Sequence, residues 1–198
     1  MVLVISIFQI LYKMINPAFI VDGFTEKLII EKICPGKTIK RADINGKNVT
    51  LDAIAKKIAS LIRLLNNRYH PIIILIDKEE RNESISDIIN SLHSKIVENG
   101  ITSCDIRIGV ADRMIENWII ADWACISSKM STKPIVTEGI NGTSVIKKNK
   151  INYNKTTDGV NLFLLANQKI IYKNSESYRC FIDKLNDLKC EYLKFERE

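Results

Sequence analysis

A run of five consecutive aliphatic residues, Ile72–Ile76, follows Pro71 and stops abruptly at Asp77. Such a run predicts a strand that is buried on both faces, as in a parallel sheet covered by helices on each side. Elsewhere short apolar runs alternate with stretches in which apolar residues recur every three or four positions. The sequence therefore predicts an α/β fold with a mostly parallel sheet, helices on both faces and a C-terminal helical closure.

Turn residues and apolar periodicity set the boundaries of the expected elements. The predicted strands cover 18–21, 38–44, 71–76 and 104–110, and the predicted helices cover 26–33, 49–65, 84–97, 112–125, 159–169 and 175–188, with a final edge strand over 190–195. The chain then divides into an apolar N-terminal extension (1–13), an α/β core (14–125), a basic irregular insertion (126–158) and C-terminal helices with an edge strand (159–198).

Composition excludes several classes of site. The chain of 198 residues has only two histidines, and its five cysteines contain no C-x-x-C pair. These counts argue against a structural zinc site and against a disulfide framework. The apolar stretch Met1–Tyr12 is too short to span a membrane and lacks the features of a secretory signal, so we expect a cytoplasmic protein without a membrane partner. Met1 and Met14 both remain candidate start residues.

Acidic residues follow three of the predicted strands. Asp22 and Glu26 follow the first strand, Asp77 and Glu79 follow the third, and Asp112 and Glu116 follow the fourth. Asp112 and Glu116 are four residues apart, which places them on one face of the predicted helix. Ligands of open α/β sheets bind at the carboxyl ends of the strands, so these side chains are expected to meet. Carboxylates without soft ligands favour Mg²⁺ or Mn²⁺. The alternative is that these acids only cap helices and complement the helix dipoles.

Two of these acidic segments carry a family resemblance. Val21–Glu26 (VDGFTE) and Leu75–Glu79 (LIDKE) resemble the motifs of the Toprim fold, in which one strand ends in Glu-Gly-x-x-(Glu/Asp) and a later strand ends in Asp-x-Asp. The chain is also similar to a family of small Toprim-like bacterial proteins encoded beside ABC- or AAA-type ATPases in phage-defence loci of the abortive-infection and retron type. The further matching segments are Met114–Asp122, Tyr153, Lys155 and Ser175–Phe181, so the resemblance spans about residues 16–188.

Two positions depart from the Toprim pattern. Asp22 stands where the family usually has Glu, and Glu79 stands where it usually has the second Asp. Both changes keep the charge and alter the reach of the side chain by one methylene. Because Mg²⁺ demands near-octahedral geometry, these changes leave open a different metal preference or a weakened catalyst.

The resemblance implies a metal-dependent nuclease that hydrolyses phosphodiester bonds in DNA or RNA, including tRNA, as the effector of an anti-phage system with a partner ATPase. It implies that one or two Mg²⁺ or Mn²⁺ ions activate water and stabilise the leaving oxygen. Lys155 is preferred over Lys78 as the cation facing the phosphate, and Lys78 is expected to point to solvent. The implied metal ligands are Glu26, Asp77, Glu79 and Glu116, and Asp22 is a further ligand or the general base. The implied catalytic residues are Asp22, Glu26, Asp77, Glu79 and Lys155.

Two alternatives stay open beside the nuclease. The chain can instead be a catalytically degenerate binding subunit that docks on the ATPase, with the apolar extension as a partner or self-association surface. A nucleotide-binding α/β domain ranks lower, because neither common Gly-rich phosphate loop is present. Trp118 is expected to pack in the core and not to stack on bases.

The net charge of +6 is unevenly distributed. From Lys129 to Lys155 the chain carries six lysines and one glutamate. Within this stretch Lys147, Lys148 and Lys150 are the candidate nucleic-acid contacts, because lysine clusters neutralise backbone phosphates. The alternative is a solvated lysine-rich loop.

Overall fold

The fold, described by a computed structural model for residues 15–44, 49–126, 134–149, 152–188 and 190, is α/β. Its four strands form one all-parallel sheet in the order β2-β1-β3-β4. This confirms the predicted fold class. The strands are β1 (Ala18–Val21), β2 (Thr38–Arg41), β3 (Ile72–Asp77) and β4 (Ile106–Ala111).

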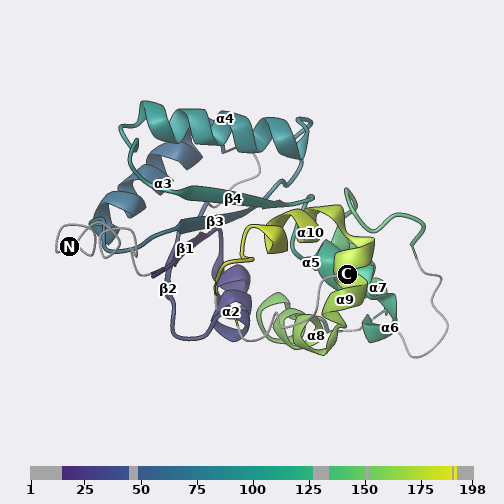
Figure 1. Cartoon of the computed structure of the whole chain (residues 1–198). Helices are drawn as coiled ribbons and strands as arrows, with labels where there is room; N and C mark the ends of the chain where they lie inside the picture. The colour runs from purple at the N-terminus through teal and green to yellow at the C-terminus, as the bar shows by residue number, and fades with distance from the viewer. Residues whose placement is uncertain (1–14, 45–48, 127–133, 150–151, 189, 191–198) are drawn as a thin grey trace.

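Helices cover both faces of the sheet. Helices α3 (Leu51–Leu65) and α4 (Ile85–Glu98) lie on one face, and α2 (Phe24–Ile33) lies on the other (Figure 1). Successive side chains of a strand point to opposite faces. In β3, Ile74 joins the apolar cluster beneath α3 and α4, whereas Leu75 joins the cluster beneath α2. The aliphatic run is therefore buried on both faces of the sheet, as its sequence predicts.

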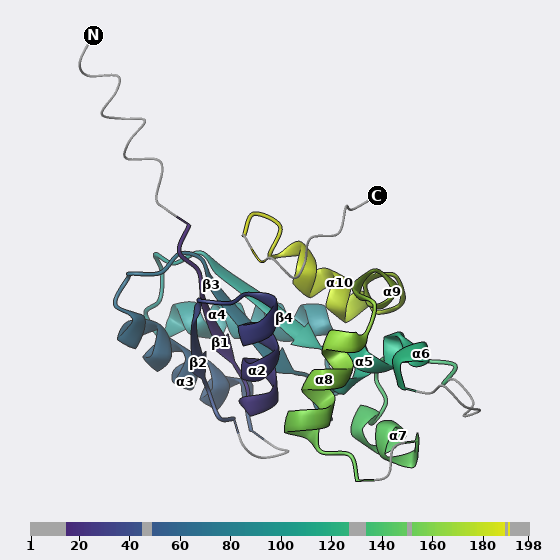
Figure 2. The same ribbon diagram turned by 90° about the horizontal axis from the view of Figure 1, so that it is seen from below.

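After β4 the described elements of the chain are all helical. Figure 2 shows α8 beside α2, which brings the C-terminal helices against the core. Trp118 is buried there and stacks on Phe181 at 5.5 Å between ring centroids, so the prediction of a core role is confirmed. The helices are α5 (Glu116–Ala121), α6 (Trp123–Ile126), α7 (Gly142–Asn149), α8 (Val160–Leu165), α9 (Gln168–Asn174) and α10 (Glu176–Asp183), with one π-helical turn, η1 (Lys155–Gly159).

Several boundaries differ from the prediction. The helix expected over 112–125 begins only at Glu116 and breaks at Asp122, whose carboxylate accepts a hydrogen bond from the Asn167 N–H. The helix expected over 159–169 is also broken, because Asn167 caps a new helix, α9. The segment 126–158 is not irregular throughout, since it contains α7 and most of η1. The apolar extension and residues 191–195 of the expected edge strand lie outside the described residues.

A disulfide joins Cys34, at the end of α2, to Cys190. The expectation against a disulfide framework did not foresee this bond, although Cys104, Cys125 and Cys180 are free. The two residues are 156 positions apart, so neither spacing nor composition indicated that they meet. Within the described part of the chain, no helix is long and apolar enough to cross a membrane.

Candidate functional site

The candidate site lies at the carboxyl edge of the sheet, between β1 and β3. From β1 the sheet continues to β2 on one side, and from β3 it continues to β4 on the other. Such a reversal of strand order opens a crevice at the carboxyl ends, where ligands of α/β proteins bind. Asp22 follows β1 directly, and Asp77 is the last residue of β3. The topology therefore places the two acidic motifs side by side.

Glu26 is positioned by the first turn of α2. Its Oε2 accepts a hydrogen bond of 3.0 Å from the N–H of Gly23, the helix N-cap. A carboxylate in the first turn also complements the helix dipole, so the predicted capping role is real. The side chain is only 4% exposed, and its Oε1 lies 3.9 Å from the Lys155 Nζ with no hydrogen-bond partner. Capping thus uses one oxygen and leaves the other to face the crevice.

Asp77 and Glu116 are held in the same manner. The Asp77 Oδ1 accepts a hydrogen bond of 3.1 Å from the Ile115 N–H, and its Oδ2 lies 4.0 Å from the Lys155 Nζ. The Glu116 Oε1 accepts one of 3.1 Å from the Thr143 hydroxyl, and its Oε2 lies 3.5 Å from the same ammonium. Each of these carboxylates therefore has one oxygen fixed by the protein and one directed toward a shared centre.

That centre is the ammonium group of Lys155. Lys155 opens the π-helical turn η1, which Asn154 caps by accepting hydrogen bonds from the Thr156 and Thr157 N–H groups. The Lys155 side chain is 41% exposed, so it enters the cluster from the solvent side. Single π-turns are frequent at functional sites. The residue implied by the family resemblance is thus the one that contacts the acidic cluster.

Burial and mutual repulsion raise the proton affinity of the acids. Burial and then the charge of Glu26 raise the pKa of Asp22 to about 6 and hold the pKa of Asp77 well above its usual value. Burial also raises the pKa of Glu26, which Lys155 partly offsets. Burial alone would lower the pKa of Lys155, but the charges of Glu116, Asp77 and Glu26 outweigh it and raise that pKa. Asp22, Glu26 and Asp77 therefore hold their protons more tightly than isolated acids do, even with Lys155 beside them.

Asp22 and Glu79 form the rim of the crevice. The Asp22 Oδ1 accepts a hydrogen bond of 3.2 Å from the Ile44 N–H. Glu79 adopts a left-handed backbone (φ 56°), its N–H donates to the Arg113 carbonyl, and its Oε2 lies 3.9 Å from Arg81. The charge of Glu79 contributes to the raised pKa of Asp22. Glu79 is therefore near the site but is not one of the carboxylates that contact Lys155.

Two sequence expectations beside the rim are wrong. Lys78 does not point freely to solvent, because its Nζ lies 3.5 Å from the Asp112 Oδ1 and its side chain is half-buried. Asp112 and Glu116 do not share a helix face, because α5 begins at Glu116. Asp112 pairs with Lys78, whereas Glu116 turns to Lys155.

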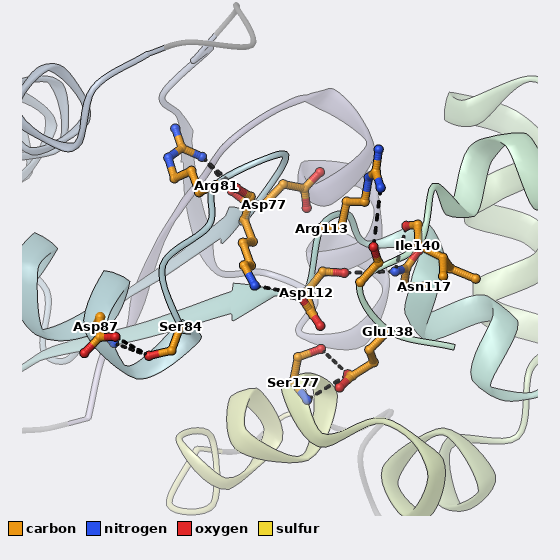
Figure 3. Close-up of polar contacts among 12 residues, drawn as sticks. Asp77, Arg81, Ser84, Asp87, Asp112, Arg113, Asn117, Glu138, Ile140 and Ser177 are labelled. Atoms are coloured by element: carbon orange, nitrogen blue, oxygen red, sulfur yellow. Dashed lines mark hydrogen bonds and ion pairs between the residues drawn. The ribbon is translucent and has the colours of Figure 1, made fainter. Parts of the chain in front are cut away.

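Polar contacts between distant segments complete the site, and sequence reasoning missed them. The Asn117 side-chain amide donates to the carbonyls of Asp112 and Ile140, and the Glu138 carboxylate accepts from Ser177 (Figure 3). These contacts place the start of α7 against Glu116. A β-carbon at Gly142 would lie 2.9 Å from the Glu116 Cβ, which explains the glycine. The adjacent residues Asn141 and Gly142 are a sequence signal for a turn, but this signal does not indicate which distant residues the turn contacts.

The predicted basic contacts lie near this loop. Lys147 and Lys148 are exposed in the last turn of α7, whose first turn contacts Glu116. Their charges therefore sit on an element that also shapes the crevice. Lys150 lies outside the described residues.

The donor set fits a hard divalent cation. All candidate ligands are carboxylate oxygens, and the inward oxygens of Glu26 and Glu116 are buried without hydrogen-bond partners. Mg²⁺ and Mn²⁺ prefer such oxygen ligands. As they stand in the described ranges, no three His, Cys, Asp or Glu side chains are arranged so that they could hold a metal ion. The carboxylates instead surround the Lys155 ammonium at 3.5–4.0 Å, so binding a metal requires Lys155 to withdraw.

Comparisons with known proteins add no neighbour. No model of a known family matches the chain, and no curated protein or solved structure matches it either.

Proposed function

We propose that this protein is a divalent-metal-dependent nuclease that hydrolyses phosphodiester bonds in DNA or RNA. The observation that carries the proposal is the convergence of Glu26, Asp77 and Glu116 at the carboxyl edge of a parallel sheet, each with one oxygen held and one presented. Asp22 and Glu79 add further carboxylates at the rim. The Toprim resemblance assigns the same residues, and it alone supplies the anti-phage role and the partner ATPase.

The proposed chemistry divides among these residues. Glu26, Asp77 and Glu116 would hold Mg²⁺ or Mn²⁺, which supplies Lewis-acid stabilisation of the phosphate and activation of water when bound. Asp22, with a pKa of about 6, is ionised at neutral pH and can accept a proton from the attacking water. The raised pKa of Lys155 keeps its ammonium charged, so it can donate to a phosphate oxygen on which negative charge develops.

The test is a cleavage assay on the full chain. Plasmid DNA, single-stranded DNA and tRNA are incubated with Mg²⁺ or Mn²⁺, with and without the neighbouring ATPase. Asp77→Asn is expected to abolish cleavage, whereas Glu98→Gln, an exposed acid on α4, leaves it unchanged. If wild type and Asp77→Asn behave alike on every substrate, the nuclease proposal fails.

A catalytically degenerate binding subunit is the second candidate. One observation favours it: the Lys155 ammonium already supplies a positive charge within 4.0 Å of three carboxylates. Metal titration separates the two. A working metal site raises the melting temperature as Mg²⁺ or Mn²⁺ is added, because ligand binding stabilises the folded state by mass action. A degenerate site shows no such rise in wild type.

A further inference from the structure

An exposed aromatic ring stands beside the acidic cluster. Phe24, the first residue of α2, is 46% exposed and belongs to neither apolar cluster of the described residues. An exposed ring of this size gains little from the fold, since most of the benefit of an aromatic residue comes from burial. Core packing therefore does not explain it.

The ring has a cation on each of two neighbouring elements. The Lys27 Nζ lies 6.0 Å from the ring centroid, and the Arg41 Cζ of β2 lies 5.4 Å from it. Among the described residues both cations pair with exposed acids, with the Lys27 Nζ at 3.2 Å from Glu31 and the Arg41 Nε at 3.4 Å from Asp43. Exposed ion pairs of this kind contribute about 0–1 kcal/mol. The two cations can therefore exchange these partners for phosphate groups at little cost.

The backbone links the ring directly to the carboxylates. Phe24 follows Gly23, whose N–H holds Glu26, and comes two residues after Asp22. Residues two apart on a helix project roughly 200° from one another, so Glu26 points into the crevice while Phe24 points toward β2. The strand end is tied to the same place, because the Asp43 N–H donates to the Asp22 carbonyl. A bound polymer strand that crosses the surface at Gly23 would therefore pass from the acidic cluster to the Phe24 ring.

We propose that Phe24, Lys27 and Arg41 form a binding surface for single-stranded nucleic acid, on which Phe24 stacks a base next to the phosphate held at the acidic cluster. An aromatic ring between cations is how proteins bind single strands without reading their sequence. This inference deepens the proposed nuclease function and names single strands as its substrate class. Duplex DNA offers no free base face to such a ring.

The test measures binding to the full chain by fluorescence anisotropy in EDTA, so that cleavage does not intervene. The probes are a labelled oligothymidylate, an oligouridylate and an abasic oligonucleotide of equal length and charge. Wild type is expected to bind the base-bearing strands about tenfold or more tighter than the abasic strand. The two base-bearing probes distinguish DNA from RNA.

The variants separate the effect of the aromatic ring from the effect of side-chain volume. Phe24→Ala and Phe24→Leu are expected to lose the preference for bases, while Phe24→Trp keeps it. Leu64→Ala, at an apolar residue of α3 that is even more exposed than Phe24, serves as the control and keeps it too. Equal binding of abasic and base-bearing strands by wild type, or an unchanged preference in Phe24→Leu, would overturn the inference.

A parallel cleavage assay keeps this outcome separate from the nuclease proposal. Base-dependent binding through Phe24 without cleavage in any metal would support this surface and refute the nuclease. Cleavage that Phe24→Ala leaves unchanged, together with unchanged binding, would refute this surface and leave the nuclease standing.

Discussion

Replacing Asp22 with asparagine should stabilise the folded protein at neutral pH, although Asp22 belongs to the candidate site. Burial and the charge of Glu26 raise the pKa of Asp22 from its ordinary value of 3.8 to about 6. The folded state therefore binds a proton more tightly than the unfolded chain does. Stability from this group is fully present below pH 3.8 and is lost as the pH rises to about 6. Asparagine does not ionise, and its side-chain oxygen can still accept from the Ile44 N–H.

The magnitude follows from the two pKa values. One pH unit of difference corresponds to 1.36 kcal/mol, so a pKa raised from 3.8 to about 6 represents about 3 kcal/mol at full effect. Asp22 is half-buried, so solvent screening reduces this to about 2 kcal/mol. Asp22→Asn should therefore exceed wild type in its free energy of unfolding by about 2 kcal/mol above pH 7, and the difference should vanish near pH 4.

Urea denaturation in EDTA at about pH 4 and about pH 7.5 measures both values. Asp52→Asn is the matched control with the opposite sign, because its hydrogen bond to Lys95 lowers the pKa of Asp52. That variant should lose stability at pH 7.5, and most of the loss should persist at about pH 4, because the contribution of Asp52 disappears only as the pH falls below its lowered pKa. The reasoning is refuted if Asp22→Asn is less stable than wild type at pH 7.5, or if its advantage does not depend on pH.

Three further predictions concern the groups around the site. Lys155→Met should lower the free energy of unfolding by about 2 kcal/mol at neutral pH, which is less than for a fully buried ion pair because the lysine is partly exposed. Urea denaturation should show that this loss shrinks in acid, as the carboxyls that face Lys155 become protonated. Gly142→Ala should cost about 1–3 kcal/mol in the same assay, since its β-carbon would clash with Asn117. Cys190→Ser should lower the stability by about 2–4 kcal/mol, because it removes the bond to Cys34. Dithiothreitol should destabilise wild type to a similar extent and leave this variant unchanged, because the variant has no such bond to reduce.

The sheet and half of the site could be predicted because both depend on local pattern. A buried strand shows as an aliphatic run, and parallel strands necessarily bring their carboxyl ends to one edge. Asp22, Glu26 and Asp77 therefore follow from strand positions alone. The same reasoning gave approximate helix boundaries, which shifted where a side chain such as Asn167 caps a new helix.

The other half of the site depends on contacts that have no period in the sequence. The loop before α7 is fixed by the Asn117 amide and by Glu138, which reaches Ser177. These are single pairs between residues far apart in the chain, so a window of neighbouring residues contains no trace of them. Lys155 entered the prediction only through family resemblance, for the same reason.

The central lysine also bears on whether the acidic cluster is a site or a structural element. A cluster that served stability alone would gain from apolar replacement, because buried ion pairs seldom repay their desolvation. Here the inward oxygens of Glu26 and Glu116 lack hydrogen bonds, and the neighbouring Glu79 and Arg113 hold left-handed backbones (φ 56° and 68°) that cost free energy. Backbone strain and three carboxyl groups that share one ammonium are costs that a fold retains where a ligand compensates them. A cation that replaces the Lys155 ammonium among these carboxylates would do so.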